Sequence, residues 1–188
     1  MAFFVCYNDV MVALKKWKVD ELLAIDKAGL LNPEKRIELI EGELYEMPIG
    51  ENHASILMRL NSILVPQFAG RALVNIQNPL RLGEFGLPQP DLALLEPSPD
   101  FYAQRHPEPS NVYLPIEIAD STLKYDQEVK LPSYARHGVR EVWIVDVAAG
   151  QTLVYRNPQV SGYQTLEVVP AGQPIHPSAF PEDTILPL

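Results

Sequence analysis

The sequence has a single cysteine, Cys6, among its 188 residues. An internal disulfide and a metal site built from several thiolates are therefore both excluded. No apolar run is long enough to cross a bilayer. Residues 2–14 are fairly apolar, but polar residues interrupt them and lysines follow them, which is the reverse of the charge order in a secretory signal. These absences predict a cytoplasmic protein.

Positive charge is also scarce. The chain has 15 Lys and Arg against 24 Asp and Glu, a formal net charge of −9. Proteins that bind duplex DNA usually carry a basic surface, so this balance counts against tight, non-specific DNA binding. It does not exclude a nucleic-acid partner, because metal sites are built from carboxylates and bound cations offset their charge.

The rest of the composition is typical of a globular protein. Hydrophobic residues make up 47% of the chain and charged residues 21%, both ordinary values. A chain of this length buries about 70% of its unfolded surface in one core. With no internal repeat or low-complexity tract, residues 1–188 are predicted to form a single domain.

Hydrophobic periodicity predicts an α/β fold with a mixed central sheet flanked by helices. Helices are predicted at 19–25, with Asp20 as the N-cap, and at 52–68 and 126–137. Pro132 conflicts with the last of these. Glu41-Gly42 predicts a tight hairpin between 37–40 and 43–47. Further strands are predicted at 72–77, 91–95, 112–119, 141–147, 153–156 and 164–169.

Two carboxylates lie in strands that are otherwise apolar. Glu117 interrupts the run 113–119, and Asp91 follows Pro90 at the start of another apolar run. An unpaired charge in such a strand is costly, and Mg²⁺ needs only one or two carboxylates with waters and a phosphate. Lys130, on the next predicted helix, could orient a metal-bound water or neutralise a phosphate.

Each of these residues also has an ordinary structural interpretation. An Asp after a proline is often a turn residue. A strand glutamate can pair with an arginine at a sheet edge, and a helical lysine usually faces solvent. The order and chemistry of Asp91, Glu117 and Lys130 together favour a shared site over three separate structural roles.

The motif Pro90-Asp91, Ile116-Glu117-Ile118-Ala119 and Lys130 resembles the PD-(D/E)-x-K, or restriction-endonuclease-like, superfamily. Residues from about 14 to 180 further resemble a large bacterial family of endonuclease-like proteins without an assigned substrate, and residues 1–13 lie outside this match. The matching segments are 17–21, 36–44, 77–82, 88–95, 125–126, 129–135 and 138–146.

The resemblance implies a restriction-endonuclease-like core and a role for each site residue. Asp91, Glu117 and the Ile118 carbonyl would bind Mg²⁺ or Mn²⁺, and Lys130 would position or activate the attacking water. Ala119 stands where the superfamily has its lysine, and the family resembled has the lysine displaced to the following helix, which maps to Lys130. The resemblance also implies an extra upstream acid, which maps to Glu38.

Three further residues keep two interpretations each. Glu38 is either that upstream acid or a strand residue facing solvent. His53, at the start of a long helix, either contacts phosphate or is an ordinary surface histidine. Asp120 is either an acid that supports the site or a turn residue.

The function expected from the sequence is a metal-dependent endonuclease that hydrolyses nucleic acid, DNA in preference to RNA. The alternative is a catalytically weak or inactive binding or assembly module on the same fold. The negative charge and Ala119 favour the alternative, whereas the two retained carboxylates oppose it. A metal hydrolase for a smaller phosphorylated substrate would fit the charge. No membrane partner is expected, and a homodimer is left open.

Overall fold

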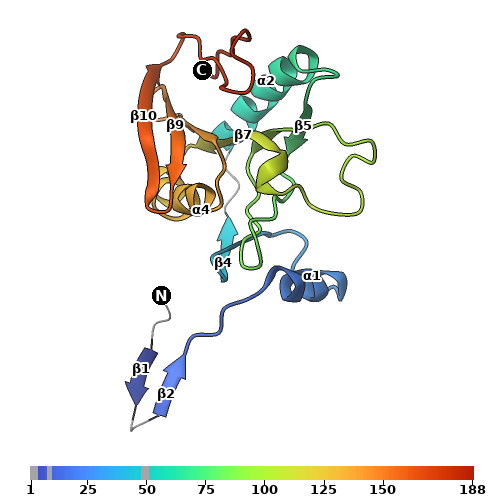
Figure 1. The fold of residues 1–188 in the computed structure, drawn as a ribbon, viewed down its shortest axis with the longest axis vertical. Helices are drawn as coiled ribbons and strands as arrows, with labels where there is room; N and C mark the ends of the chain where they lie inside the picture. The colour runs from blue at the N-terminus through green and yellow to red at the C-terminus, as the bar shows by residue number, and fades with distance from the viewer. Residues whose placement is uncertain (1–3, 8–9, 48–50) are drawn as a thin grey trace.

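Six strands form one mixed β-sheet in the computed structural model, which describes residues 4–7, 10–47 and 51–188. The strand order is β10-β9-β8-β7-β6-β5, so β10 and β5 form the two edges (Figure 1). The β7–β8 pair is parallel and the other four adjacent pairs are antiparallel. The expected α/β fold with a mixed sheet is confirmed. The strands are β5 (Leu73–Ile76), β6 (Leu92–Leu95), β7 (Val112–Ala119), β8 (Glu141–Asp146), β9 (Gln151–Gln159) and β10 (Gly162–Pro170).

The sheet has a helix against each face. Helix α2 (Glu51–Gln67) places Leu60 and Leu64 in a core with the β7 residues Leu114, Ile116 and Ile118. Helix α4 (Leu131–Arg136) packs on the other face. Because side chains alternate along a strand, Glu117 points away from the α2 core and toward the α4 side.

The crossover between β7 and β8 is helical but not uniform. It runs through α3 (Leu123–Tyr125), a π-helical turn η2 (Asp126–Lys130) and α4. The Leu131 N–H bonds the carbonyl of Asp126, five residues back. Pro132 has no N–H, and in an α-helix its ring would clash with the carbonyl four residues earlier. The wider turn accommodates it, and the side chains of Asp126 and Lys130 within this turn are buried. The sequence predicts one helix over 126–137 with Pro132 as a conflict, and the structure resolves that conflict with the π-helical turn.

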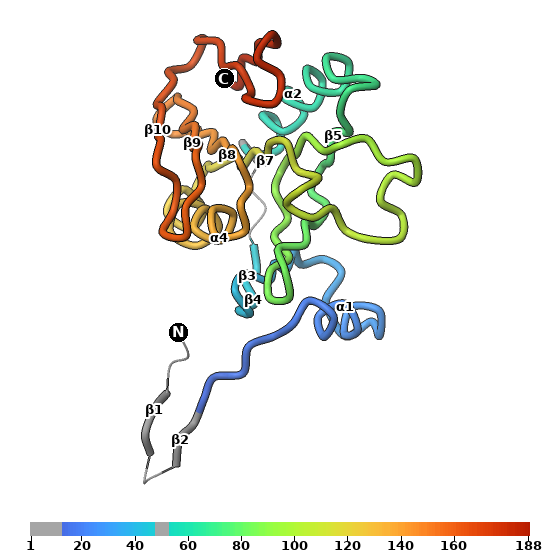
Figure 2. The backbone as a smooth tube through the Cα atoms, in the orientation of Figure 1, coloured from blue at the N-terminus to red at the C-terminus, as the bar shows by residue number. Residues whose placement is uncertain are grey.

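A separate hairpin lies beside the sheet. Strands β3 (Arg36–Ile40) and β4 (Glu43–Met47) pair as predicted, and both turn residues have positive φ, 51° at Glu41 and 84° at Gly42. Two such residues make the turn that fits a two-residue hairpin. A Cβ at Gly42 would come within 2.8 Å of the Lys16 Cβ, so glycine is required there. A bridge from Leu39 to Leu87 joins the hairpin to the main body (Figure 2).

The remaining described elements lie outside the sheet. Helix α1 (Val19–Lys27) begins two residues earlier than the predicted cap allows, and Lys18, not Asp20, is the N-cap, with its N–H bonded to Glu21 at 2.9 Å. Strands β1 (Phe4–Tyr7) and β2 (Val10–Ala13) form an antiparallel pair that the sequence does not predict. A short 3-10 turn, η1 (Pro109–Asn111), precedes β7. Within the described ranges, no helix has the length and apolarity to span a membrane.

A buried ion pair at the start of β8 gives a test of the fold. The carboxylate of Glu141 is 1% exposed and accepts hydrogen bonds from Trp143 Nε1 (2.8 Å), Arg156 Nε (3.0 Å) and the Ser178 N–H (2.6 Å). Arg156→Ala leaves that charge without its counter-ion. We therefore expect the free energy of unfolding, measured by urea denaturation, to fall by about 3–5 kcal/mol.

The matched control for this prediction is Lys18→Ala. It removes an ion pair with Glu84 in which both side chains are about half exposed, and exposed pairs contribute little to stability. Similar losses in the two variants would contradict a structural role for the buried pair.

Candidate active site

Asp91 and Glu117 lie opposite each other at the ends of neighbouring strands. Strands β6 and β7 are antiparallel with Leu92 opposite Ile116, and one further step in this register sets Asp91 opposite Glu117. Opposite residues of an antiparallel pair point to the same face. Asp91 is fixed there by the Ile118 N–H, which donates to its Oδ2 at 2.8 Å. The structure therefore brings the two carboxylates to one site, as the sequence predicts.

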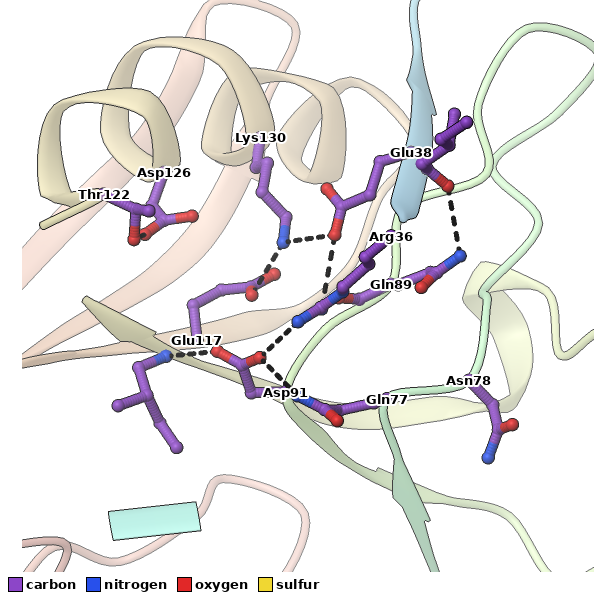
Figure 3. Close-up of polar contacts among 12 residues, drawn as sticks. Arg36, Glu38, Gln77, Asn78, Gln89, Asp91, Glu117, Thr122, Asp126 and Lys130 are labelled. Atoms are coloured by element: carbon purple, nitrogen blue, oxygen red, sulfur yellow. Dashed lines mark hydrogen bonds and ion pairs between the residues drawn. The ribbon is translucent and has the colours of Figure 1, made fainter. Parts of the chain in front are cut away.

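Lys130 reaches this site from the π-helical turn. Its Nζ lies 2.7 Å from Glu117 Oε2 and 3.4 Å from Glu38 Oε1 (Figure 3). All three residues are no more than 2% exposed. Tyr134, one helical turn further on, donates its hydroxyl proton to Glu117 Oε1 at 2.8 Å. Glu38 thus joins the buried site, and the interpretation as a solvent-facing strand residue is wrong.

Arg36 is a site residue that the sequence argument misses. Its Nη1 lies 2.9 Å from Asp91 Oδ1 and its Nη2 lies 3.3 Å from Glu38 Oε1, and it also donates to the Gln89 carbonyl. The guanidinium therefore bridges two site carboxylates (Figure 3). Arg36 and Glu38 are two residues apart, which places both side chains on one side of β3. This spacing could have indicated Arg36 as a site residue.

His53 and Asp126 complete the polar surroundings. His53 Nε2 lies 2.9 Å from Asp91 Oδ1, so this histidine, near the start of α2, contacts a site carboxylate. Asp126 is 3% exposed and accepts a hydrogen bond of 2.7 Å from the Thr122 hydroxyl. Asp120 lines the same pocket. The sequence left His53 and Asp120 open and did not single out Asp126.

The sequence of this chain matches one family over most of its length. The profile of the family described as "Uma2: Putative restriction endonuclease" matches residues 19–188. The chain belongs to the Uma2 family. The resemblance to restriction-endonuclease-like proteins is thereby confirmed. A comparison with curated proteins gives no match.

A solved structure has the same fold. It is titled as a "putative nuclease belonging to DUF820" from Anabaena variabilis ATCC 29413, and it is 22% identical to this chain. The superposition has a TM-score of 0.63 and covers 90% of this chain and 94% of the other. At this identity the likeness establishes the shared fold, and the roles of individual site residues in the Uma2 chain stay predictions.

The buried site carries more negative than positive charge. Its four buried carboxylates are Glu38, Asp91, Glu117 and Asp126, and the cations that face them are Arg36 and Lys130, joined by His53 when it is protonated. The formal excess is two negative charges with a neutral histidine. Such an excess in a low-dielectric site is relieved by binding protons or a cation.

The pKa values of the site follow from this imbalance. Burial raises the pKa of Glu117 to about 8 and that of Asp126 to about 6, against the opposing charge of Lys130. Burial alone would lower the pKa of Lys130, but the charges of Glu117 and Glu38 outweigh it and raise that pKa, so the ammonium stays protonated. Burial alone would raise the pKa of Asp91, but its hydrogen bond with His53 and the charges of Lys130 and Arg36 keep that pKa below the usual value.

The residues of this site fit a divalent cation that completes its shell with water and phosphate. Among the described residues, no three His, Cys, Asp or Glu side chains converge as a metal cluster, but Mg²⁺ commonly takes only one or two carboxylates. The excess of two negative charges matches one such ion. Asp91, Glu117 and Ile118 line a pocket of about 40 Å³. The N–H and C=O of a strand residue point the same way, so the Ile118 carbonyl faces the Asp91 side.

Proposed function

We propose that this Uma2 protein is a Mg²⁺- or Mn²⁺-dependent nuclease that hydrolyses phosphodiester bonds of DNA. The observation that carries the proposal is the meeting of Asp91, Glu117 and Lys130 at one small pocket with an unbalanced negative charge. Fold alone does not fix function, so the proposal depends on this chemistry and on membership of the family. The cytoplasmic location and a homodimer stay predictions from the sequence.

The metal would be held by the carboxylates of Asp91 and Glu117 and by the Ile118 carbonyl. When bound, a divalent cation acts as a Lewis acid on the phosphate and increases the acidity of its water. The Ile118 N–H and Tyr134 hydroxyl fix one oxygen of each carboxylate. Each carboxylate therefore keeps its orientation, which favours a defined position for the ion.

Lys130 supplies the positive charge that the reaction needs. Water attacks phosphorus in line: its oxygen forms the new P–O bond and its proton passes to solvent. The P–O bond to the leaving nucleotide breaks on the opposite side, and the leaving oxygen takes a proton from solvent. Negative charge builds on the phosphate during this step, and the protonated Lys130 neutralises it. Glu38, bonded to both Lys130 and Arg36, holds these cations in place and would support the attacking water or a second ion.

A catalytically weak or inactive binding module is the second candidate. Its support is that Arg36 and Lys130 already neutralise Asp91 and Glu117 in this structure, together with the net charge of −9. A nuclease must exchange part of that pairing for a metal and a phosphate. Metal-dependent turnover separates the two candidates.

The test is a cleavage assay with the full chain. Single-stranded DNA, duplex DNA and RNA are incubated with Mg²⁺, Mn²⁺ or EDTA, and the products are separated on denaturing gels. We expect DNA fragments with either metal and none with EDTA. The variant Glu117→Gln, purified identically, controls for contaminating nucleases. If the folded wild-type chain cleaves nothing under all these conditions, the binding module becomes the better description.

A further inference from the structure

A second, larger groove adjoins the catalytic pocket. Its volume is about 460 Å³, within the range of sites that bind small organic groups. The two share Met47, Ser121 and Thr122 in their walls, so they lie next to each other. A ligand held in the catalytic pocket can therefore extend into the groove. The remaining lining residues are Tyr45, Glu46, Lys124, Tyr125, Glu128 and Val129.

Two half-buried tyrosines form the aromatic wall of the groove. The ring centroids of Tyr45 and Tyr125 are 5.1 Å apart, with the rings tilted by 57°. Each ring is held at its polar end, since the Tyr45 hydroxyl donates to Glu43 at 2.8 Å and that of Tyr125 to Glu38 at 3.4 Å. Glu38 also contacts Lys130, which links the groove to the catalytic site. The rings are thus positioned before any ligand binds.

The charge of the groove does not suit a duplex. One lysine, Lys124, lies among its lining residues with two carboxylates, Glu46 and Glu128. Affinity for duplex DNA comes largely from cations that neutralise phosphates, and this surface has few. Stacking of a base on an aromatic ring needs no such charge, because every base has a π-face.

The narrowness of the catalytic pocket leads to the same conclusion. Its volume is about 40 Å³, and its site carboxylates are at most 4% exposed. A stacked, paired strand presents its phosphates on a wide, stiff cylinder, whereas an unpaired strand can turn a single phosphate inward and turn its base aside. The aromatic groove lies where that base would go.

We propose that the groove between β4 and α3–η2 binds an unpaired nucleobase next to the scissile phosphate, so that the substrate is a single strand or an unpaired segment. This inference rests on the proposed function for the phosphate site and adds the substrate class. Tyr45 and Tyr125 stack on the base, and Lys124 contacts an adjoining phosphate. Base identity is not read, because no buried amide or carboxylate is aimed into the groove among its lining residues.

Binding of labelled oligonucleotides tests the groove without requiring cleavage. Fluorescence anisotropy in EDTA compares a 15-mer of dT, the same strand with abasic sites at all internal positions, and a duplex of equal length. Phosphate charge is equal in the two strands, so only stacking distinguishes them. We expect the intact strand to bind about 5- to 150-fold more tightly than the abasic strand.

Substitutions then locate the effect. Tyr45→Ala should remove most of the preference for the intact strand, and Tyr45→Phe should retain it because the ring is kept. Tyr102→Ala is the control, since Tyr102 is also half-buried but lies outside both pockets. Equal binding of the intact and abasic strands by the wild-type chain overturns the inference, whatever the variants do.

Cleavage with Mn²⁺ separates this inference from the proposed function. Faster cleavage of the single strand than of the duplex supports both. If the chain cleaves duplex efficiently and Tyr45→Ala does not change the rate, base binding in the groove is contradicted and the proposed nuclease activity is supported. Tighter binding of the intact strand than of the abasic strand, without any cleavage, supports base binding in the groove and contradicts the proposed nuclease activity.

Discussion

Mn²⁺ or Mg²⁺ is expected to raise the melting temperature of the wild-type chain, and the double variant Asp91→Asn/Glu117→Gln is expected to lose that rise. A ligand that binds only the folded state stabilises it by about 2.7 kcal/mol at a concentration of 100 Kd. For a chain of this size, that energy corresponds to roughly 5–11 °C. Neutral amides keep the shape of both side chains but remove the two charges that attract the ion. Differential scanning fluorimetry against metal concentration measures the effect.

The control for this prediction is a carboxylate matched in burial but outside the site. Glu141 is 1% exposed and accepts a hydrogen bond from Arg156. It is the first residue of β8 and does not line the pocket of Asp91 and Glu117. Glu141→Gln should lower the melting temperature by itself and yet keep the full metal-induced rise. An unchanged metal response in Asp91→Asn/Glu117→Gln would show that the ion binds elsewhere, and the proposed site would have to be abandoned. Ca²⁺ serves as a second probe, since it also takes oxygen ligands.

The carboxylate pair could be predicted because its signal is local. Glu117 interrupts an alternating strand, and Asp91 begins an apolar run, so each residue is out of place in its own segment. Pairing of β6 with β7 then follows from ordinary strand order. The hairpin at Glu41-Gly42 could be predicted for a similar reason, because the glycine tolerates the positive φ that such a turn requires.

The rest of the site depends on contacts between distant segments. Arg36 and Asp91 are 55 residues apart, and only packing of the β3–β4 hairpin beside the sheet brings them together. The aromatic wall joins Tyr45 to Tyr125 across 80 residues. Periodicity carries no information about such pairs. The π-helical turn could be predicted only in part. Pro132 conflicts with a regular helix, but the sequence does not indicate whether a kink or a wider turn accommodates it.

Lys130→Met is expected to lower turnover by about 10²- to 10³-fold, as loss of one donor to the developing charge usually does. The methionine has a similar length but no charge, so Glu117 and Glu38 remain buried without the ammonium that lies 2.7 Å and 3.4 Å away. Breaking a buried pair in this way costs about 3–5 kcal/mol. We therefore expect a lower melting temperature in EDTA. Metal should restore part of it, because the ion now has no competing cation.

Lys130→Arg should restore little of the lost turnover. Lys130 is 2% exposed and is surrounded by packed side chains, so a larger side chain would strain its surroundings, and a planar guanidinium does not replace a compact ammonium. The exposed Lys27→Met on α1 is the matched control and should leave turnover and stability unchanged. Single-turnover rates, measured well below the melting temperature of each variant, separate lost chemistry from lost folding. Wild-type turnover in Lys130→Met would limit Lys130 to charge balance in the folded state. The attacking water would then be positioned by Glu38, which contacts Lys130, or by His53, which contacts Asp91.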